Sequence, residues 1–252
     1  MMHPLISIIV PTLNEEQTIE SCLCSLEKQT WHNFEIIVVD GGSTDKTAHI
    51  AKDYQAKIIV EKECPEFPSR NIGAKIANGE ILLFICADVV LPADLLANIH
   101  RKFESNKELI ALTGPDIPLN SMLAKIEYGV YNFIRYLFNS FPRPQKRFST
   151  STNFLAVRKR HFEKVRGFVS DINADGIMGK QLCNIGRVEF CPKMHVFIST
   201  RRFAKMGFFE FNLHYLYVLE NFFPFLSRNN ILRKYKQISG ATHRKLHELP
   251  QG

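Results

Sequence analysis

A single carboxylate interrupts an apolar run at residues 84–92, FICADVVLP. An unpaired buried aspartate costs several kcal/mol, so Asp88 is expected to be hydrogen-bonded, paired with a cation or kept at the surface. Two other polar segments also follow apolar runs: Pro11-Thr12-Leu13-Asn14-Glu15 and Asp40-Gly41-Gly42-Ser43. The guanidinium of Arg70, followed by Asn71, lies shortly after a third apolar run.

Short, nearly continuous apolar runs in the first half are typical of strands buried on both faces of a parallel sheet. Helical patterns alternate with them, and Asn14 with Gln17 forms a capping-box pattern at the first helix. This order predicts an α/β fold with a doubly wound, mainly parallel sheet, which binds ligands at the carboxyl ends of its strands. The expected strands are 5–10, 34–39, 57–60, 80–85 and 109–113, and the expected helices 15–28, 45–54, 68–77 and 93–105.

The second half departs from this alternation. Residues 121–141 form an amphipathic helical pattern, with one apolar stripe (Leu123, Ile126, Val130, Phe133, Leu137 and Phe141) opposite Lys125, Asn132, Arg135 and Asn139. A Pro-rich basic loop at 141–147, a strand at 150–157 and a short helix at 158–165 follow. An aromatic helix at 203–226 and a basic tail then form a helical C-terminal extension, so we divide the chain into 1–202 and 203–252.

Composition narrows the class of protein. At 252 residues and 45% apolar, the chain can bury the core of one domain with a helical appendage. The N-terminus has no basic n-region or cleavage site, which predicts a cytoplasmic protein. The six cysteines show no zinc-site spacing and are expected to be reduced structural thiols.

Charge is segregated along the chain. Residues 1–118 carry 10 Lys and Arg against 17 Asp and Glu, whereas residues 119–252 carry 22 against 8. The net charges are therefore −7 and +14, which sum to the formal +7 of the whole chain. The basic half suits an anionic partner such as a phosphate or a membrane surface. A nucleic-acid partner is not expected, because no recognised binding module is present.

Four motifs in this order resemble the inverting glycosyltransferases of family 2, which have the GT-A nucleotide-sugar-binding fold. They are SIIVPTLNEE (7–16), FEIIVVDGGSTDKT (34–47), PSRNIGAKIANGE (68–80) and FICADVVLP (84–92). The resemblance implies a GT-A catalytic domain at 1–202. It also implies transfer of a sugar from a nucleotide-diphosphate donor to a lipid-linked (lipid-phosphate) or saccharide acceptor.

The resemblance also implies roles on the donor side. Asp88 would be the last residue of the family's Asp-x-Asp motif and would bind Mg²⁺ or Mn²⁺ that bridges the diphosphate. Cys86 stands at the first Asp position, so one of the two carboxylates is missing. Pro11 and Leu13 would line the base pocket, Glu15 would lie near the ribose or base, Asp40 would accept a hydrogen bond from the base, and Arg70 would contact the nucleotide.

Structural alternatives exist for three of these donor-side residues. Asp40 could cap the turn at Ser43, Arg70 could pair with Glu66, and Asp88 could be an ordinary turn residue.

On the acceptor side, the resemblance places a general base in Asn173-Ala174-Asp175-Gly176. Asp175 would be this base, although Ala174 stands where the family usually has a first acid. Asp171 is an alternative base, and a simple helix N-cap is another role for Asp175. A lipid-phosphate acceptor would need no base, because its second pKa of about 6 leaves it anionic at neutral pH. Arg201 and Arg202 would meet the donor diphosphate or the acceptor phosphate.

Residues 207–226 combine eight aromatics with two glutamates and a proline, which argues against a membrane-spanning helix. We expect an interfacial helix, peripheral on the cytoplasmic membrane face, or a homodimer contact. Two other functions remain open. The losses at Cys86 and Ala174 would suit a catalytically degenerate protein that binds nucleotide sugar or membrane. A nucleotidyltransferase would share the sheet but needs a Gly-rich basic loop, which PTLNEE lacks.

Overall fold

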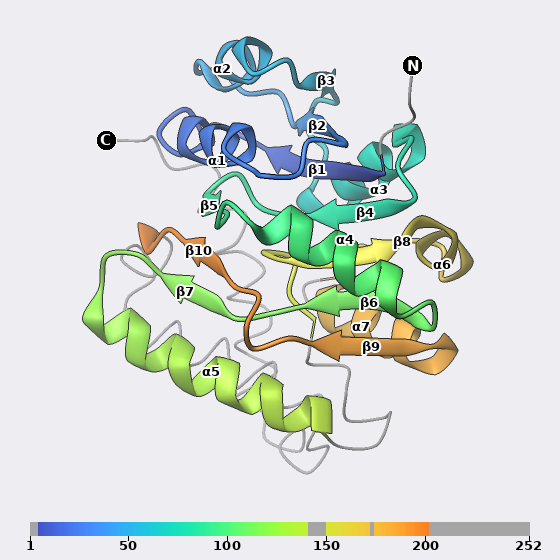
Figure 1. The fold of residues 1–252 in the computed structure, drawn as a ribbon. Coiled ribbons are helices and arrows are strands. Elements are labelled where there is room, and N and C mark those ends of the chain that lie inside the picture. Colours follow the sequence, from blue (N-terminus) through green and yellow to red (C-terminus); the bar gives the residue numbers. More distant parts are fainter. Residues whose placement is uncertain (1–4, 141–149, 172–173, 202–252) are drawn as a thin grey trace, which may run out of the picture. The chain divides into compact units, whose positions relative to one another are not determined.

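A seven-stranded mixed sheet organises the chain in the computed structural model (Figure 1), which describes residues 5–140, 150–171 and 174–201. Residues Met1–Ser199 form one compact unit, and Thr200–Gly252 form a second, of which only residues 200 and 201 are described. The sheet has the order β3-β2-β1-β4-β8-β6-β9. Its strands are β1 (Ile6–Thr12), β2 (Phe34–Asp40), β3 (Lys57–Val60), β4 (Ile81–Phe84), β6 (Leu109–Thr113), β8 (Leu155–Arg158) and β9 (Arg187–Phe190).

Strand direction brings several strand ends to one edge of this sheet. β1, β2, β3 and β4 are mutually parallel, and Thr12 lies beside Asp40. β8 runs antiparallel to both β4 and β6, and its Leu155 is level with Phe84 on one side and Thr113 on the other. The carboxyl ends of β1, β2, β4 and β6 therefore share one edge with the start of β8. The expected doubly wound, mainly parallel α/β fold is confirmed.

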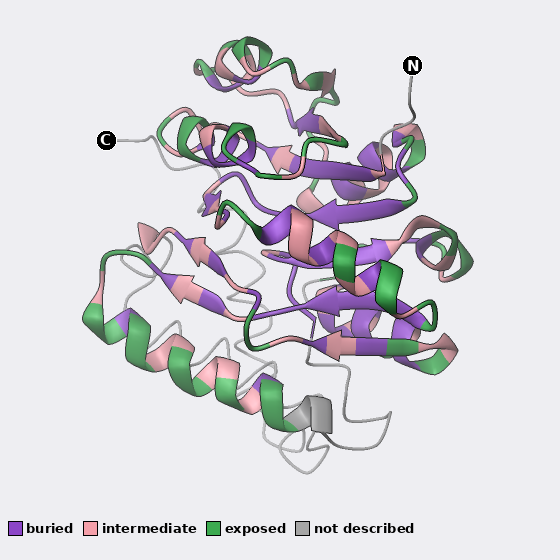
Figure 2. Cartoon of the chain, viewed as in Figure 1, coloured by how far each residue is buried: buried purple, intermediate pink, exposed green. Residues whose placement is uncertain are grey.

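Helices cover both faces of the sheet because alternate residues of each strand face opposite sides. Ile6, Ile8 and Val10 pack with α1 and α4, whereas Ile9 and Phe84 pack with α3, α6 and α7. The central strands are buried on both faces (Figure 2), as their continuous apolar runs predict. The helices are α1 (Ile19–Glu27), α2 (Thr47–Asp53), α3 (Glu66–Ile76), α4 (Leu95–Ser105), α6 (Lys159–Lys164) and α7 (Ala174–Ile185).

A second, three-stranded sheet joins segments that are far apart in the sequence. β10 (Val196–Ile198) pairs antiparallel with β5 (Val89–Val90) and parallel with β7 (Asp116–Pro118). The backbone N–H of Ser199 also donates to the carbonyl of Asp88 at 3.1 Å. This small sheet therefore holds the segments that carry Asp88 and Asp116.

α5 (Met122–Ser140) confirms the amphipathic helix expected at 121–141, but Asn132 and Arg135 of its polar face turn inward while Lys125 is exposed. Arg135 is fully buried and Asn132 is partly buried, whereas Ile126, Val130 and Phe133 on the apolar stripe are 56–61% exposed. Exposed segments recur along this helix in Figure 2. The reason is the partner beneath it: α5 packs on β7, whose Asp116 offers polar groups instead of an apolar surface.

Other local expectations differ from the structure. The capping box is wrong: Asn14 has φ +53°, its side-chain oxygen accepts from the Thr44 N–H at 2.9 Å, and α1 begins later, at Ile19. β5, β7 and β10 were not expected, because two or three residues are too short for a hydrophobic pattern to reveal. No helix among the described residues is long and apolar enough to cross a membrane. The aromatic helix at 203–226 and the basic tail lie outside the described residues.

Candidate active site at the carboxyl edge of the sheet

Asp40 ends β2 and is 2% exposed, with its carboxylate held by neighbours on two segments. Its Oδ1 accepts from the hydroxyls of Thr12 (3.2 Å) and Ser43, and its Oδ2 accepts from the Ser43 N–H at 3.0 Å. Gly42 has φ +98°, a left-handed conformation that suits glycine and folds the turn back onto the carboxylate. Asp40 thus caps its turn, and Oδ2 retains the capacity for a further hydrogen bond.

The segment after β1 lies directly against the Asp40 turn. The Gly41 N–H donates to the Thr12 carbonyl at 2.8 Å, and the Glu15 N–H donates to the Thr47 hydroxyl at 2.7 Å. The Glu15 side chain accepts from the Thr18 hydroxyl at 2.8 Å. Pro11, Leu13 and Glu15, the residues expected to contact the base and ribose, are all partly exposed beside Asp40. Their roles stay predictions.

Arg70 lies in α3 and is fully buried. It donates from Nη1 to the Ile85 carbonyl at 3.0 Å, and from Nη2 to Glu66 Oε1 at 2.7 Å and Cys86 Sγ at 3.2 Å. Burial alone would lower the pKa of Arg70, but Cys86 and Glu66 outweigh it and raise the pKa. Arg70 therefore pairs with Glu66 inside the protein, and Cys86 fills the position beside this guanidinium.

Asp88 follows β4 and leads into β5, and its side chain is partly exposed. Its negative charge raises the pKa values of two buried groups, Cys22 and Asp116. Burial, then Asp88 and Cys86, raise the pKa of Cys22, and Asp88 also contributes to the raised pKa of Asp116. Asp88 is thus an accessible carboxylate beside a second, buried one, at the edge where the sequence predicts a diphosphate site.

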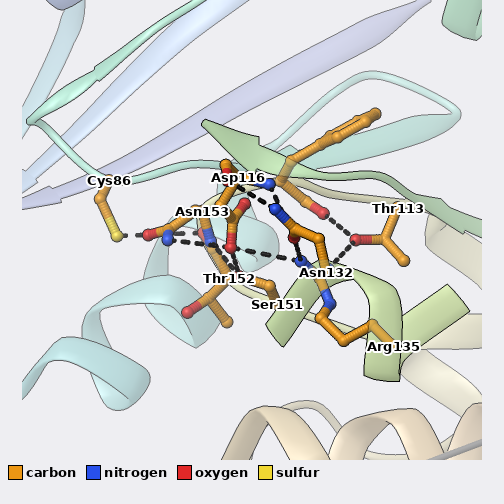
Figure 3. A network of polar contacts seen from close by, with 9 residues as sticks. Cys86, Thr113, Asp116, Asn132, Arg135, Ser151, Thr152 and Asn153 are labelled. Carbon is orange, nitrogen blue, oxygen red and sulfur yellow. Dashed lines mark hydrogen bonds and ion pairs between the residues drawn. The ribbon is translucent and has the colours of Figure 1, made fainter. Parts of the chain in front are cut away.

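Asp116, three residues after β6, is a buried carboxylate that the sequence reasoning missed. Its Oδ2 accepts from Ser151 (3.0 Å), Asn153 (3.3 Å) and Arg135 (3.3 Å), as Figure 3 shows. Its Oδ1 is buried with no hydrogen-bond partner. Burial raises the pKa of Asp116, and Arg135 opposes this shift. Its position after a predicted strand, like that of Asp40 and Asp88, was the signal that could have found it.

The same network holds α5 in place. The Asn132 amide donates to the Asp116 carbonyl at 2.8 Å and accepts from the Asp116 N–H at 3.1 Å. Arg135 also donates to the Thr113 hydroxyl at 3.0 Å, and its guanidinium lies 5.0 Å from the Phe190 ring centre. The polar face of α5 is therefore bonded to the edge of the candidate site.

Asp175 lies in the first turn of α7, and its Oδ1 accepts from the Gly176 N–H at 2.8 Å. Burial raises the pKa of Asp175 to about 6. The charge of Glu66 also raises this pKa, whereas the charges of Arg135 and Arg70 lower it. The Thr150 hydroxyl donates to its carbonyl at 2.8 Å, which ties α7 to the segment before β8. Asp175 is thus near the groups around Arg70, with the perturbed pKa of a candidate acid or base.

The structure brings most of the predicted site to one edge of the sheet. Asp40 ends β2 and Asp88 follows β4, which are parallel strands on either side of β1, while Arg70 and Asp175 reach this edge from helices. Asp171 is described and exposed. Arg201 belongs to the second unit, and Arg202 lies outside the described residues, so the phosphate roles of both arginines stay predictions.

Comparison with known proteins agrees with these motifs. The family model described as "Glycosyl transferase family 2" matches residues 7–166, which is more than half of the chain. A Mycobacterium bovis protein described as "PGL/p-HBAD biosynthesis glycosyltransferase" is 39% identical over 106 residues, covering 39% of this chain and 41% of that protein. Bacillus subtilis EpsJ, an uncharacterized glycosyltransferase, is 34% identical over 111 residues, which cover 42% and 32% of the two chains. The match thus spans less than half of each relative.

Solved structures show the same fold. The mannosyltransferase PcManGT from Pyrobaculum calidifontis, in complex with GDP-Man and Mn²⁺, superposes with a TM-score of 0.63 at 20% identity, covering 91% of this chain and 66% of that one. Residues 1–349 of S. aureus TarS with UDP-GlcNAc superpose with a TM-score of 0.60 at 20% identity, covering 77% and 58%. The fold is therefore that of the GT-A glycosyltransferases. Together with the family match, this shows that the chain belongs to glycosyltransferase family 2.

Proposed function

We propose that this chain is an inverting glycosyltransferase, which moves a sugar from a nucleotide-diphosphate donor to a lipid-phosphate or saccharide acceptor. One observation carries the proposal: Asp40, Asp88 and Asp175 converge on the carboxyl edge of the sheet in a family 2 chain. In open α/β sheets this edge is where ligands bind. The complexes of PcManGT with GDP-Man and of TarS with UDP-GlcNAc support a nucleotide-sugar donor.

The donor base would bind beside Asp40. The carboxylate is immobilised by Thr12 and Ser43, so its remaining acceptor capacity points in a set direction. A fixed acceptor selects for a base that presents an N–H to it. Pro11 and Leu13 provide partly exposed apolar surface at the same place.

Asp88 would hold a divalent cation. Among the described residues, no group of three or more His, Cys, Asp or Glu side chains could hold a metal ion. One accessible carboxylate instead fits a cation that arrives with the donor, because Mg²⁺ is commonly bound by one or two carboxylates plus substrate phosphates. Such a cation, Mg²⁺ or Mn²⁺, would supply positive charge opposite the departing diphosphate. The Mn²⁺ in the PcManGT complex supports this assignment.

Asp175 is the candidate base for a hydroxyl acceptor. Its raised pKa of about 6 means that it is mostly ionised at neutral pH yet more basic than an ordinary aspartate. It would take the hydroxyl proton as the acceptor oxygen attacks the anomeric carbon. A phosphate acceptor has no such proton to lose at neutral pH. In that case Asp175 contributes little, and the predicted phosphate contacts of Arg201 and Arg202 dominate.

Donor binding is tested by thermal stabilisation. UDP and GDP, with and without Mn²⁺, are added to the wild type, to Asp88→Asn and to Asp94→Asn, an exposed matched aspartate outside the site. A ligand that binds only the native state raises its melting temperature. We expect a metal-dependent rise in the wild type and in Asp94→Asn that Asp88→Asn loses. An equal rise in all three would remove Asp88 from the metal role.

Acceptor class is tested by sugar transfer in detergent to a short polyprenyl phosphate and to a saccharide panel. For a lipid phosphate, Asp175→Asn should lose far less than the roughly hundredfold typical of removing a general base, and Arg202→Ala should lose more. Transfer to saccharide hydroxyls alone, abolished by Asp175→Asn, would establish the saccharide acceptor. No transfer by a chain that binds nucleotide sugar would favour the catalytically degenerate alternative.

A further inference from the structure

The outward face of α5 concentrates exposed apolar side chains. Among the described residues, ten large hydrophobic side chains are exposed, and seven of them belong to this one helix. Scattered exposed apolar residues are ordinary on a protein surface, but a contiguous set marks an interaction site. We define the outer face of α5 as Met122, Leu123, Ile126, Val130, Phe133 and Leu137, with Tyr136 at its border.

These side chains form one stripe. At 100° per residue they fall within an arc of about 140° on the helix. Gly129 lies inside this arc with no other group within 4 Å of where its Cβ would be. Leu119, just before the helix, is 40% exposed and extends the stripe toward β7. Exposed apolar side chains therefore recur along residues 122–137 of this helix.

The opposite face cannot exchange places with the outer face. Arg135 is buried with hydrogen bonds to Asp116 and Thr113, and Asn132 bonds both backbone groups of Asp116. Turning α5 would break these bonds and place apolar side chains against the buried Asp116 carboxylate. The helix is therefore held with its apolar side outward.

Charge indicates what covers this face. Of residues 122–137, whose burial the structure describes, Lys125 is the one charged residue that is fully in the exposed class, whereas the one acidic residue, Glu127, is only partly exposed and its Oε2 is buried. In a contact between two copies of the face, Lys125 would find no carboxylate opposite. Against an anionic bilayer it would meet lipid phosphates, while the apolar and aromatic side chains enter the acyl boundary. Residues 141–149 add Arg143, Lys146 and Arg147 to the sequence without any acid.

We infer that the outer face of α5 binds the surface of an anionic lipid bilayer, with the helix lying parallel to the membrane. The inner face of the same helix contacts Asp116, and burial together with the charges of Asp175 and Asp116 raises the pKa of Tyr131. Membrane binding through α5 would thus bring the candidate acceptor side close to the lipid headgroups. This inference goes beyond the proposed function, because binding to vesicles needs neither donor nor acceptor.

The experiment is vesicle flotation of the full chain with roughly 70% phosphatidylcholine and 30% phosphatidylglycerol, and with phosphatidylcholine alone. The key pair is Val130→Asp in the outer face and Val60→Asp on β3, because these valines are 56% and 55% exposed. We expect binding of the wild type to anionic vesicles, a loss of about tenfold or more in Val130→Asp, and nearly unchanged binding in Val60→Asp. Lys125→Gln should bind about fivefold more weakly and with less dependence on salt.

Equal melting temperatures would show that these exposed substitutions leave the fold intact. If both Val130→Asp and Phe133→Asp bound anionic vesicles as tightly as the wild type, the inference would be overturned and the membrane contact would lie elsewhere. Absence of vesicle binding by the wild type would also overturn it. So would a change from dimer to monomer in Val130→Asp, measured by light scattering without vesicles, since the face would then be a contact between two copies. Retained stabilisation by nucleotide in these variants separates the result from any failure of the proposed function.

Discussion

Arg70 Nη2 lies 3.2 Å from Cys86 Sγ, at the position where the Asp-x-Asp motif of family 2 would place its first carboxylate. Glu66 Oε1, 2.7 Å from the same nitrogen, supplies the opposing charge instead. The Arg70 guanidinium is therefore held by a glutamate one helical turn earlier and by a thiol two residues after the end of β4. This arrangement gives Cys86 a role in positioning Arg70.

Substitutions at Cys86 test that role. Cys86→Ser keeps an atom that accepts from Arg70, so its turnover should stay within a few fold of wild type. Cys86→Val removes the acceptor and should lower the free energy of unfolding by about 1 kcal/mol, measured with urea. Cys86→Asp should tighten Mn²⁺ binding by adding a second carboxylate. Abolished activity in the serine variant would show that the thiol itself is needed for function.

Replacing Arg70 should damage the fold as well as donor binding. Arg70→Leu removes the donor to the partly exposed Glu66 carboxylate and to the Ile85 carbonyl, and should cost about 2 kcal/mol in the free energy of unfolding. Glu66→Gln is the milder control, since an amide oxygen can still accept. Lost nucleotide binding at unchanged stability would instead assign Arg70 to the nucleotide alone.

The pKa of Asp175 predicts a pH dependence of stability. Its folded value of about 6 exceeds the ordinary 3.8, so the folded state disfavours the ionised form. As pH rises from about 4 to above 6, the unfolded chain ionises first and folding loses stability. Asp175→Asn escapes this loss. Its melting temperature relative to wild type should therefore rise over this range, and a constant difference between pH 4 and pH 8 would contradict the raised pKa.

The same group predicts a pH dependence of activity. With a saccharide acceptor, kcat/KM should rise as pH increases through about 6, because the base must be deprotonated. With a polyprenyl phosphate acceptor, Asp175→Asn should keep the wild-type pH profile, because the base is not used. A profile that changes with this substitution on the lipid phosphate would assign Asp175 a role with both acceptors.

The ion pair of Asp116 and Arg135 should be strongly coupled. Asp116→Asn leaves the buried guanidinium without its carboxylate and should cost about 3 kcal/mol in the free energy of unfolding. Arg135→Met should lower the free energy of unfolding by a similar amount, because it leaves the buried Asp116 carboxylate without its cation. The loss of unfolding free energy in the double variant should be smaller than the sum of the losses in the two single variants, as measured by a double-mutant cycle. Strict additivity would contradict a direct interaction.

Local patterns in the sequence were sufficient for the main sheet. Ile6–Val10 and Ile81–Phe84 are apolar at nearly every position, so burial on both faces follows without any knowledge of their neighbours. The ends of such parallel strands share one edge, which is why Asp40 and Asp88 could be placed together. Which groups satisfy each side chain was not readable, because Thr12 and Ser43 meet Asp40 only after folding.

Tertiary structure decided what a local pattern leaves open. The spacing of Ile126, Val130 and Phe133 predicted a stripe on a helix, but periodicity describes a stripe in the same way whether it faces the core or the solvent. Asp116 settled the direction, since its buried carboxylate and backbone groups needed the hydrogen bonds that Asn132 and Arg135 provide. A buried polar group left without partners costs more than an apolar stripe left exposed at the surface.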